Sequence, residues 1–238
     1  MINRMKRGFT LVEILTAMGL VGFIAAGAMG FYVQSIKNGN ASEQNIELGS
    51  TMRTFMDEMI FSGSRSHELV LYRSSVAADR TAAGRLVVLN SDNEIETDDI
   101  CPTGNFAVFV FYELPKPAAV DQYRISKLVG YFLEQTDTGP AALVRMTIDL
   151  SSSPSEDTVE EILADHWNSA QRRTIAPRVT PLALSDGYTE ETMPQLFYRR
   201  ASQNLAVCGQ LMQSAARKNT KDRNTQTRTF FFNITVRS

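Results

Sequence analysis

The sequence Gly8-Phe9-Thr10-Leu11-Val12-Glu13 follows a short basic leader and begins an apolar stretch that continues to Val33. A stretch of about 25 residues forms a helix of roughly 37 Å, which is enough to cross a hydrocarbon core of about 30 Å. Its one formal charge is the carboxylate of Glu13. A carboxylate inside a membrane segment costs roughly 2.5–3.5 kcal/mol on insertion, so a functional role for Glu13 is expected.

The leader, residues 1–8, carries three basic side chains, which hold it on the cytoplasmic side of a membrane. The basic leader, the glycine, the aromatic residue and the glutamate together resemble the class III signal of type IV pilins and type II secretion pseudopilins. The resemblance implies that a prepilin peptidase cuts between Gly8 and Phe9 and that the new amino group of Phe9 is N-methylated. It also implies that Glu13 pairs with the Phe9 amine of a neighbouring subunit, since a buried carboxylate is tolerated when it is paired.

Two other interpretations of this segment stay open. Glu13 can lie near the lipid headgroups at the start of a helix, where the helix dipole favours an anion. Ala26-Gly27-Ala28 also fits the cleavage pattern of an ordinary secretory signal peptide. Glu13 interrupts the apolar core of such a signal, and the apolar stretch continues past Ala28, so the pilin-like interpretation is preferred.

Small residues recur within the apolar stretch at Gly22, Ala26 and Gly30. This spacing lets helices approach closely in lipid, although small residues that a membrane span merely tolerates give the same pattern. Major pilins often carry a proline near the position of Gly30. The absence of that proline favours a minor pilin or a pseudopilin.

The composition limits the class of partner. The chain has 238 residues, 43% of them hydrophobic, and a formal net charge of −2. Without its leader it keeps 21 of the 24 basic side chains against 26 acidic ones, a net charge of −5. Proteins that bind phosphate backbones are basic, so no nucleic-acid partner is expected for the domain. The length predicts one globular domain after the helix.

The helix is expected to continue past the membrane stretch. Residues 34–45 are polar and contain Asn38-Gly39-Asn40, which can bend or fray it. Apolar residues then return at helical spacing up to Ser62-Gly63, at Leu48, Met52, Phe55, Met56, Met59 and Ile60. The predicted fold is α+β and pilin-like, with this long helix packed on an antiparallel β-sheet. The predicted parts are the leader 1–8, the transmembrane assembly helix 9–33, the amphipathic continuation 34–62 and the periplasmic β-rich domain 63–238.

Segments rich in β-branched and aromatic residues predict the strands. A short helix is expected over Thr158–Trp167 with Asp157 as its cap, a hairpin over Asp137–Pro140, and polar loops over 151–157 and 214–228. Thr225–Ser238 is expected to close the sheet, or as an edge strand to pair with a neighbouring subunit. The predicted strands are Glu68–Tyr72, Arg85–Asn90, Phe106–Glu113, Lys127–Glu134, Ala142–Leu150, Gln195–Arg200 and Thr229–Val236.

Two of these strands carry a second resemblance. Leu128-Val129-Gly130-Tyr131-Phe132-Leu133-Glu134, followed by Ala142-Leu143-Val144-Arg145-Met146, resembles the J-type pseudopilins and the related W-type minor pilins. In those families a strand of the form V-x-Y-x-L leads into one of the form x-L-x-R. The resemblance covers about 25 residues and favours a minor over a major subunit.

The chain shows no catalytic motif. His67 and His166 are far apart in the sequence and in no ligand spacing, and no Walker, G-x-S-x-G or G-x-G-x-x-G pattern occurs. No enzymatic activity is expected.

Acidic residues and cysteines give two further candidates. Five acidic residues between positions 92 and 99 form an acidic cluster, which could hold Ca²⁺ through hard oxygen ligands. It lacks the glycine and ligand order of an EF-hand, so a solvated loop is preferred and no cofactor is expected. Cys101 and Cys208 can form a disulfide in an oxidising compartment or remain two thiols. The cluster consists of Asp92, Glu94, Glu96, Asp98 and Asp99.

The preferred function is that of a minor pseudopilin of a type II secretion system, anchored once in a bacterial inner membrane with its domain in the periplasm. The expected partners are the prepilin peptidase, other pilin or pseudopilin subunits, the inner-membrane assembly platform and the lipid bilayer. Two alternatives remain, a minor pilin of a type IV pilus and an exported globular protein with an ordinary signal peptide or anchor.

Overall fold

The computed structural model describes residues 10–89, 103–113, 123–136, 139–182, 194–201, 204–214 and 225–236. The chain forms two compact units, Met1–Ile46 and Glu47–Ser238. Helix α1 (Leu11–Arg65) begins in the first unit and ends in the second. The polar stretch with Asn38-Gly39-Asn40 stays helical, so the bend or fraying that it allows does not interrupt the helix. The helix ends at Arg65, beyond the expected end at Ser62-Gly63.

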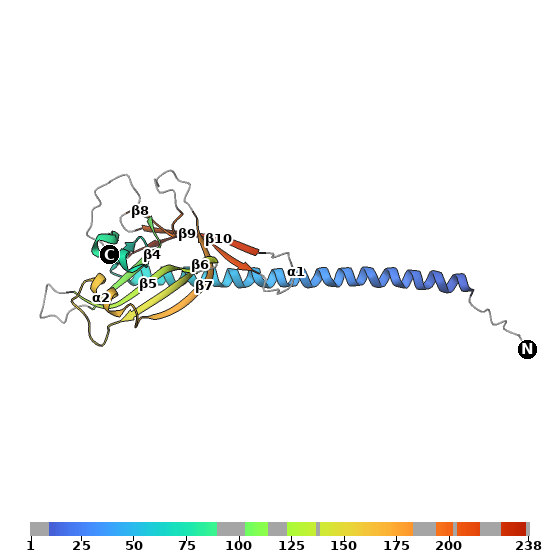
Figure 1. The fold of residues 1–238 in the computed structure, drawn as a ribbon, viewed down its shortest axis with the longest axis horizontal. Coiled ribbons are helices and arrows are strands. Elements are labelled where there is room, and N and C mark those ends of the chain that lie inside the picture. The colour runs from blue at the N-terminus through green and yellow to red at the C-terminus, as the bar shows by residue number, and fades with distance from the viewer. Residues whose placement is uncertain are drawn as a thin grey trace, which may run out of the picture. The chain divides into compact units, whose positions relative to one another are not determined.

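The second unit contains an antiparallel sheet, which confirms the predicted α+β fold (Figure 1). Within the described residues it has ten strands in the order β2-β1-β4-β5-β6-β7-β9-β8-β3, and β10 pairs with the other side of β9. The strands are β1 (Glu68–Tyr72), β2 (Arg85–Leu89), β3 (Thr103–Gly104), β4 (Phe106–Glu113), β5 (Arg124–Thr136), β6 (Gly139–Asp149), β7 (Gln171–Pro181), β8 (Phe197–Ala201), β9 (Asn204–Ser214) and β10 (Thr225–Thr235). The short helices are η1 (Ala77–Asp79), η2 (Ala82–Gly84) and α2 (Val159–His166).

Three strands were not predicted, the two-residue strand β3 and the longer strands β7 and β9. β7 begins with four exposed polar residues and contains Pro177, so it lacks the apolar alternation of a half-buried strand. In β9 the consecutive residues Leu205 to Cys208 are all buried, which also removes the alternation. The predicted loop 214–228 is wrong at its end, because β10 already begins at Thr225.

The short helix α2 follows the prediction, except for its cap. Thr158 is the N-cap, because its hydroxyl accepts the backbone N–H of Glu161 at 3.4 Å while its own N–H donates to the Glu161 carboxylate at 2.8 Å. This is the reciprocal capping box. Asp157, the predicted cap, instead accepts a hydrogen bond from the Ser155 hydroxyl at 2.6 Å.

The sheet is buried on both faces because one helix covers each of them. In β4, Ala107 and Phe109 point into the core around α1, whereas Phe106, Val108 and Val110 point into the core below α2. Successive residues of a strand point to opposite faces, so burial of both faces explains why β4 is apolar throughout.

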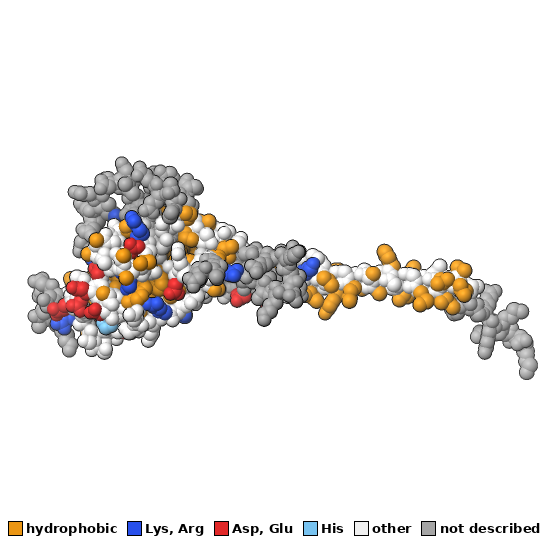
Figure 2. Space-filling model, viewed as in Figure 1, with side chains coloured by type: hydrophobic (Ala, Val, Ile, Leu, Met, Phe, Trp, Pro, Cys, Tyr) orange, Lys and Arg blue, Asp and Glu red, His pale blue; other side chains and the backbone are white. Residues whose placement is uncertain are grey.

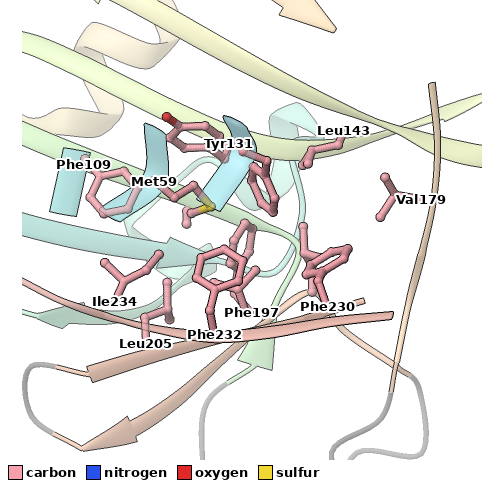
Figure 3. Close-up of a cluster of buried hydrophobic side chains, with 14 of the residues drawn as sticks. Met59, Phe109, Tyr131, Leu143, Val179, Phe197, Leu205, Phe230, Phe232 and Ile234 are labelled. Carbon is pink, nitrogen blue, oxygen red and sulfur yellow. The ribbon is translucent and has the colours of Figure 1, made fainter. Parts of the chain in front are cut away.

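The amphipathic part of α1 lies between two halves of the sheet in the second unit. Figure 3 shows Met59 of α1 between Tyr131 of β5 on one side and Phe232 of β10 on the other, with β7 crossing beside them. Phe55 is fully buried and contacts the rings of Tyr131, Phe230 and Phe232 at centroid distances of 5.5–6.2 Å. The apolar residues predicted at helical spacing from Leu48 to Met59 therefore pack in the core. Ile60, predicted with them, is 43% exposed.

A charged contact fixes α2 on the sheet. Glu160 accepts hydrogen bonds from the Tyr72 hydroxyl at 2.7 Å and from two nitrogens of the Arg85 guanidinium at 2.8 and 2.6 Å. Burial and the neighbouring carboxylate raise the pKa of Tyr72, so its hydroxyl stays protonated and donates. The single tryptophan, Trp167, follows α2 and contacts the Arg80 guanidinium at 3.7 Å.

Candidate functional site

The candidate site is the start of α1, and its described part begins at Thr10. Thr10 and Glu13 form a capping box: the backbone N–H and the hydroxyl of Thr10 each donate to the Glu13 carboxylate at 3.0 Å. The backbone N–H of Glu13 donates back to the Thr10 hydroxyl at 3.3 Å. Thr-x-x-Glu is a pattern that caps the start of a helix in this way. The sequence contained this signal, but the prediction did not use it.

The capping box bears on the two interpretations of Glu13. In the single chain the Glu13 carboxylate caps the start of the helix. This is the position that the helix-dipole interpretation assigns to it. The same carboxylate has two oxygens and accepts up to four hydrogen bonds, so the contact with Thr10 leaves capacity for an amine from another chain. Gly8 and Phe9, the predicted cleavage and methylation residues, lie outside the described residues.

The apolar part of α1 offers its side chains to the outside. Phe23 is 83% and Phe31 78% exposed within the first unit, and Figure 2 shows apolar side chains along this part of the helix. This stretch is long and apolar enough to cross a membrane. Thr16, a hydroxyl side chain of this stretch, donates back to the carbonyl of Val12 at 2.9 Å, so it adds no unsatisfied donor in lipid.

The small residues of this helix meet open space. A Cβ atom built on Gly22 or Gly30 has no atom of the described chain within 4 Å. No other part of the described chain therefore packs against Gly22, Ala26 and Gly30. Their role in packing against other helices stays a prediction.

A second polar site joins α1 to the sheet within the second unit. Glu58 of α1 pairs with Arg173 of β7 and lies 3.8 Å from Arg145 of β6. One turn further along α1, the Ser62 hydroxyl lies 3.3 Å from the Tyr131 hydroxyl of β5. Tyr131, Arg145 and Arg173 face one another across β5, β6 and β7. We refer to these five residues as the Glu58 ladder.

The Glu58 ladder gives Arg145 a structural role that the resemblance to J-type pseudopilins did not supply. Its position in the x-L-x-R pattern places it on the face of β6 that meets α1. The available signal was an arginine between apolar residues of a strand, together with Glu58 among the apolar residues of the helix. Pairing between the two is not readable without the strand register.

The predicted Ca²⁺ site and one cysteine of the predicted disulfide lie outside the described residues. The acidic cluster from Asp92 to Asp99 and Cys101 lie outside the described residues, whereas Cys208 is 7% exposed on β9. The disulfide and the Ca²⁺ site stay predictions. In the part of the chain that the structure describes, no three His, Cys, Asp or Glu side chains converge as metal ligands.

The two histidines lie apart from the N-terminal site. The Nδ1 atom of His67 accepts the backbone N–H of Tyr112 at 3.2 Å. His166 is the last residue of α2, and its carbonyl accepts the N–H of Ala170 at 2.9 Å.

Comparison with known families assigns the start of the chain. Residues 3–29 match the family model described as the prokaryotic N-terminal methylation motif. The chain carries the N-terminal segment of a type IV pilin-like protein. The motif and the apolar helix together indicate a membrane-anchored, single-pass protein with an exported domain. No match was found among the curated proteins or among the solved structures.

The methylation motif also supports processing by a prepilin peptidase and assembly with other pilin-like subunits. Proteins with this motif are typically structural rather than enzymatic. The match ends at residue 29, so it covers the capping box and the small residues Gly22 and Ala26 but not the domain. The family model therefore does not distinguish a pseudopilin from a pilin.

Proposed function

We propose that this chain is a non-enzymatic minor pseudopilin of a type II secretion system. The prepilin peptidase cuts the bond between Gly8 and Phe9, and the new terminal amine is methylated. The observation that carries the proposal is the methylation motif on a helix whose apolar stretch, up to Val33, is exposed and contains Glu13 as its one carboxylate.

The charge of Glu13 is proposed to act in assembly. In the inner membrane, the Thr10 hydrogen bonds partly compensate the carboxylate of a single subunit. In the filament the Phe9 amine of a neighbour adds the opposite charge, which a buried carboxylate requires. Gly22, Ala26 and Gly30 then let the helices approach closely.

The domain supports the choice of a minor subunit. The strands that resemble J-type pseudopilins and W-type minor pilins are β5 and β6, which pair so that Leu133 faces Leu143 and Tyr131 faces Arg145. This pairing fits the strand-to-strand order of the resembled pattern. The domain is proposed to lie in the periplasm and to contact other minor subunits and the assembly platform.

The test is deletion of the gene in its native host, followed by two measurements. The proposal predicts that exported proteins accumulate in the periplasm while surface pili and twitching motility are unchanged. Normal protein export with lost pili or motility would contradict the secretion role and support a minor type IV pilin. A Gly8→Glu variant supplied in trans should accumulate as unprocessed precursor and fail to restore export, whereas an Ala78→Gly control should restore it.

A further inference from the structure

Within the described residues, the outer edge of β10 is an unprotected edge of the sheet. β10 pairs with β9 along its whole length, from Thr225 opposite Ser214 to Thr235 opposite Asn204, without a register shift. Among the described residues, no strand pairs with its other edge. β10 contains no proline, and Arg228 is its one charged side chain. Bulges, prolines and charges are the features that keep edge strands from pairing, and β10 has almost none of them.

α1 runs beside β10 within the second unit and in the same direction. A Cβ on Gly49 would lie 2.5 Å from a guanidinium nitrogen of Arg228, and one on Gly63 would lie 2.2 Å from a methyl group of Ile234. At these two glycines, side chains of the strand therefore lie directly against the helix. Ile60 is three residues before Gly63, so it shares this side of the helix. Ile60 is 43% exposed, so this side of the helix carries an accessible apolar side chain.

The face of β10 that points away from α1 also carries an apolar side chain, at Phe231. Phe231 points away from the core and is 45% exposed. A strand added to β10 would alternate its side chains between the Ile60 side and the Phe231 side. Both sides therefore offer apolar surface to such a strand.

The other end of the edge is positively charged. Arg228 and Arg53, which lies four residues after Gly49 on α1, are both exposed. In the described part of the chain neither of them forms an ion pair with a carboxylate. An acidic side chain on an added strand would meet two arginines here. A second β10 would not fit, because it brings another Arg228 and no carboxylate.

We propose that the edge of β10 binds an extended strand of a different filament subunit, and that an acidic side chain of this strand pairs with Arg53 and Arg228. The identity of the partner rests on the proposed function. Backbone hydrogen bonds would supply affinity, and the acidic and apolar side chains would select the strand.

The experiment uses the full-length chain in its native host, with a photo-reactive amino acid in place of Thr229, an exposed residue of β10. Irradiation should join Thr229 to another protein with a methylated N-terminus, at a strand that contains Asp or Glu. The same amino acid at Thr180 is the control, because β7 is paired on both sides near this exposed residue and should give no such product.

A charge reversal then tests the pairing. Arg228→Glu should reduce the yield of the Thr229 product roughly fivefold, which corresponds to about 1 kcal/mol for a partly exposed ion pair. Arg178→Glu, at an exposed arginine of β7, should leave the yield unchanged. Trp167 fluorescence of each variant reports whether the domain is folded.

Three results would overturn the proposal: no product from Thr229, a product with an exported cargo protein or lipid only, or a yield that Arg228→Glu does not change. N-terminal analysis of the same samples separates this proposal from the proposed function. If Phe9 is methylated but Thr229 gives no product, the strand-binding proposal alone is wrong. If the chain begins at Met1 or Met29, the filament function is wrong, and the assignment of the partner falls with it.

Discussion

Glu13 has one contact that the structure shows, with Thr10, and one proposed contact, with the amine of a neighbouring subunit. The Thr10 contacts partly satisfy the carboxylate at the start of the helix. They also mean that a Glu13 variant loses the cap and the charge together. A test of the assembly role therefore has to separate the two.

Glu13→Ala should leave cleavage largely intact and sharply reduce incorporation into filaments, because it removes the charge that meets the Phe9 amine. Thr10→Val removes the hydroxyl of the cap, at a cost of about 1 kcal/mol to the helix start, and keeps the charge. It should therefore incorporate at near-normal levels. The measurement is the fraction of each variant in sheared or purified filaments. Equal loss in both variants would mean that capping, and not charge pairing, explains Glu13.

Glu160 is the residue whose loss should destabilise the domain most through electrostatics. Glu160→Ala leaves Tyr72 without its acceptor and Arg85 without its carboxylate. Removing one partner of a buried ion pair lowers the free energy of unfolding by about 3–5 kcal/mol. We expect the lower end, about 3 kcal/mol, for Glu160→Ala because Arg85 is 34% exposed. Denaturant unfolding of the full-length chain in detergent, followed by Trp167 fluorescence, measures this loss.

The matched control is Glu156→Ala, because the pair between Glu156 and Arg124 is about half exposed. Its loss should cost less than about 1 kcal/mol. Similar losses for the two variants would show that burial of the Glu160 contact does not contribute to stability as described.

At the scale of elements, the packing of α1 on the sheet combines an apolar row with the Glu58 ladder. Phe55→Ala removes a fully buried ring that contacts three other rings, so the free energy of unfolding should fall by about 3–5 kcal/mol. Ile60→Ala shortens a side chain that is 43% exposed, so it should lower the free energy of unfolding much less. The same unfolding experiment measures both. A small loss for Phe55→Ala would argue against α1 as the centre of the core.

The Glu58 ladder should contribute specificity of packing more than stability. Glu58→Gln and Arg173→Gln, combined in a double-mutant cycle, should give a coupling energy of about 1 kcal/mol, because Arg173 is 57% exposed. Hydrogen exchange should rise in the part of α1 around Glu58 in both single variants. The exposed residue Arg178 provides the control, and its coupling with Glu58 should be absent.

The sequence predicted those elements whose pattern follows one periodicity. α1 and the strands β1, β4, β5 and β6 carry continuous apolar or β-branched patterns, and the structure has them at nearly the predicted positions. β7 and β9 were missed because tertiary contacts decide them: β7 is largely exposed, and Gly209 of β9 allows the Phe230 ring to approach where a Cβ would lie at 2.6 Å. The same limit applies to the Glu58 ladder, because register determines which side chains meet.

At the scale of the whole molecule, an exported domain is anchored by its N-terminal helix. The domain has its own core on both faces of the sheet, so folding and assembly are separable. The local signals for processing and anchoring lie within the first 33 residues and are readable from sequence. The surface proposed to select a partner, the edge of β10, lies on the domain and depends on which strand is at the edge of the sheet.

Anchoring by α1 predicts that the full-length chain stays in the membrane fraction after alkaline carbonate washing and is released by detergent. The reason is that a helical stretch of about 25 apolar residues spans the hydrocarbon core. A Val21→Arg, Ala25→Arg double variant should be lost from this fraction, since each arginine at the helix centre costs roughly 2.5–3.5 kcal/mol. Retention of that variant would show that other contacts hold the protein at the membrane.

The most direct test of the central claim is the intact mass and N-terminal sequence of the native protein from its membrane fraction. The account predicts a chain that begins with Phe9 and carries one additional methyl group on its amine. A chain that begins at Met1 and still supports normal export, or one that begins at Met29, would contradict it.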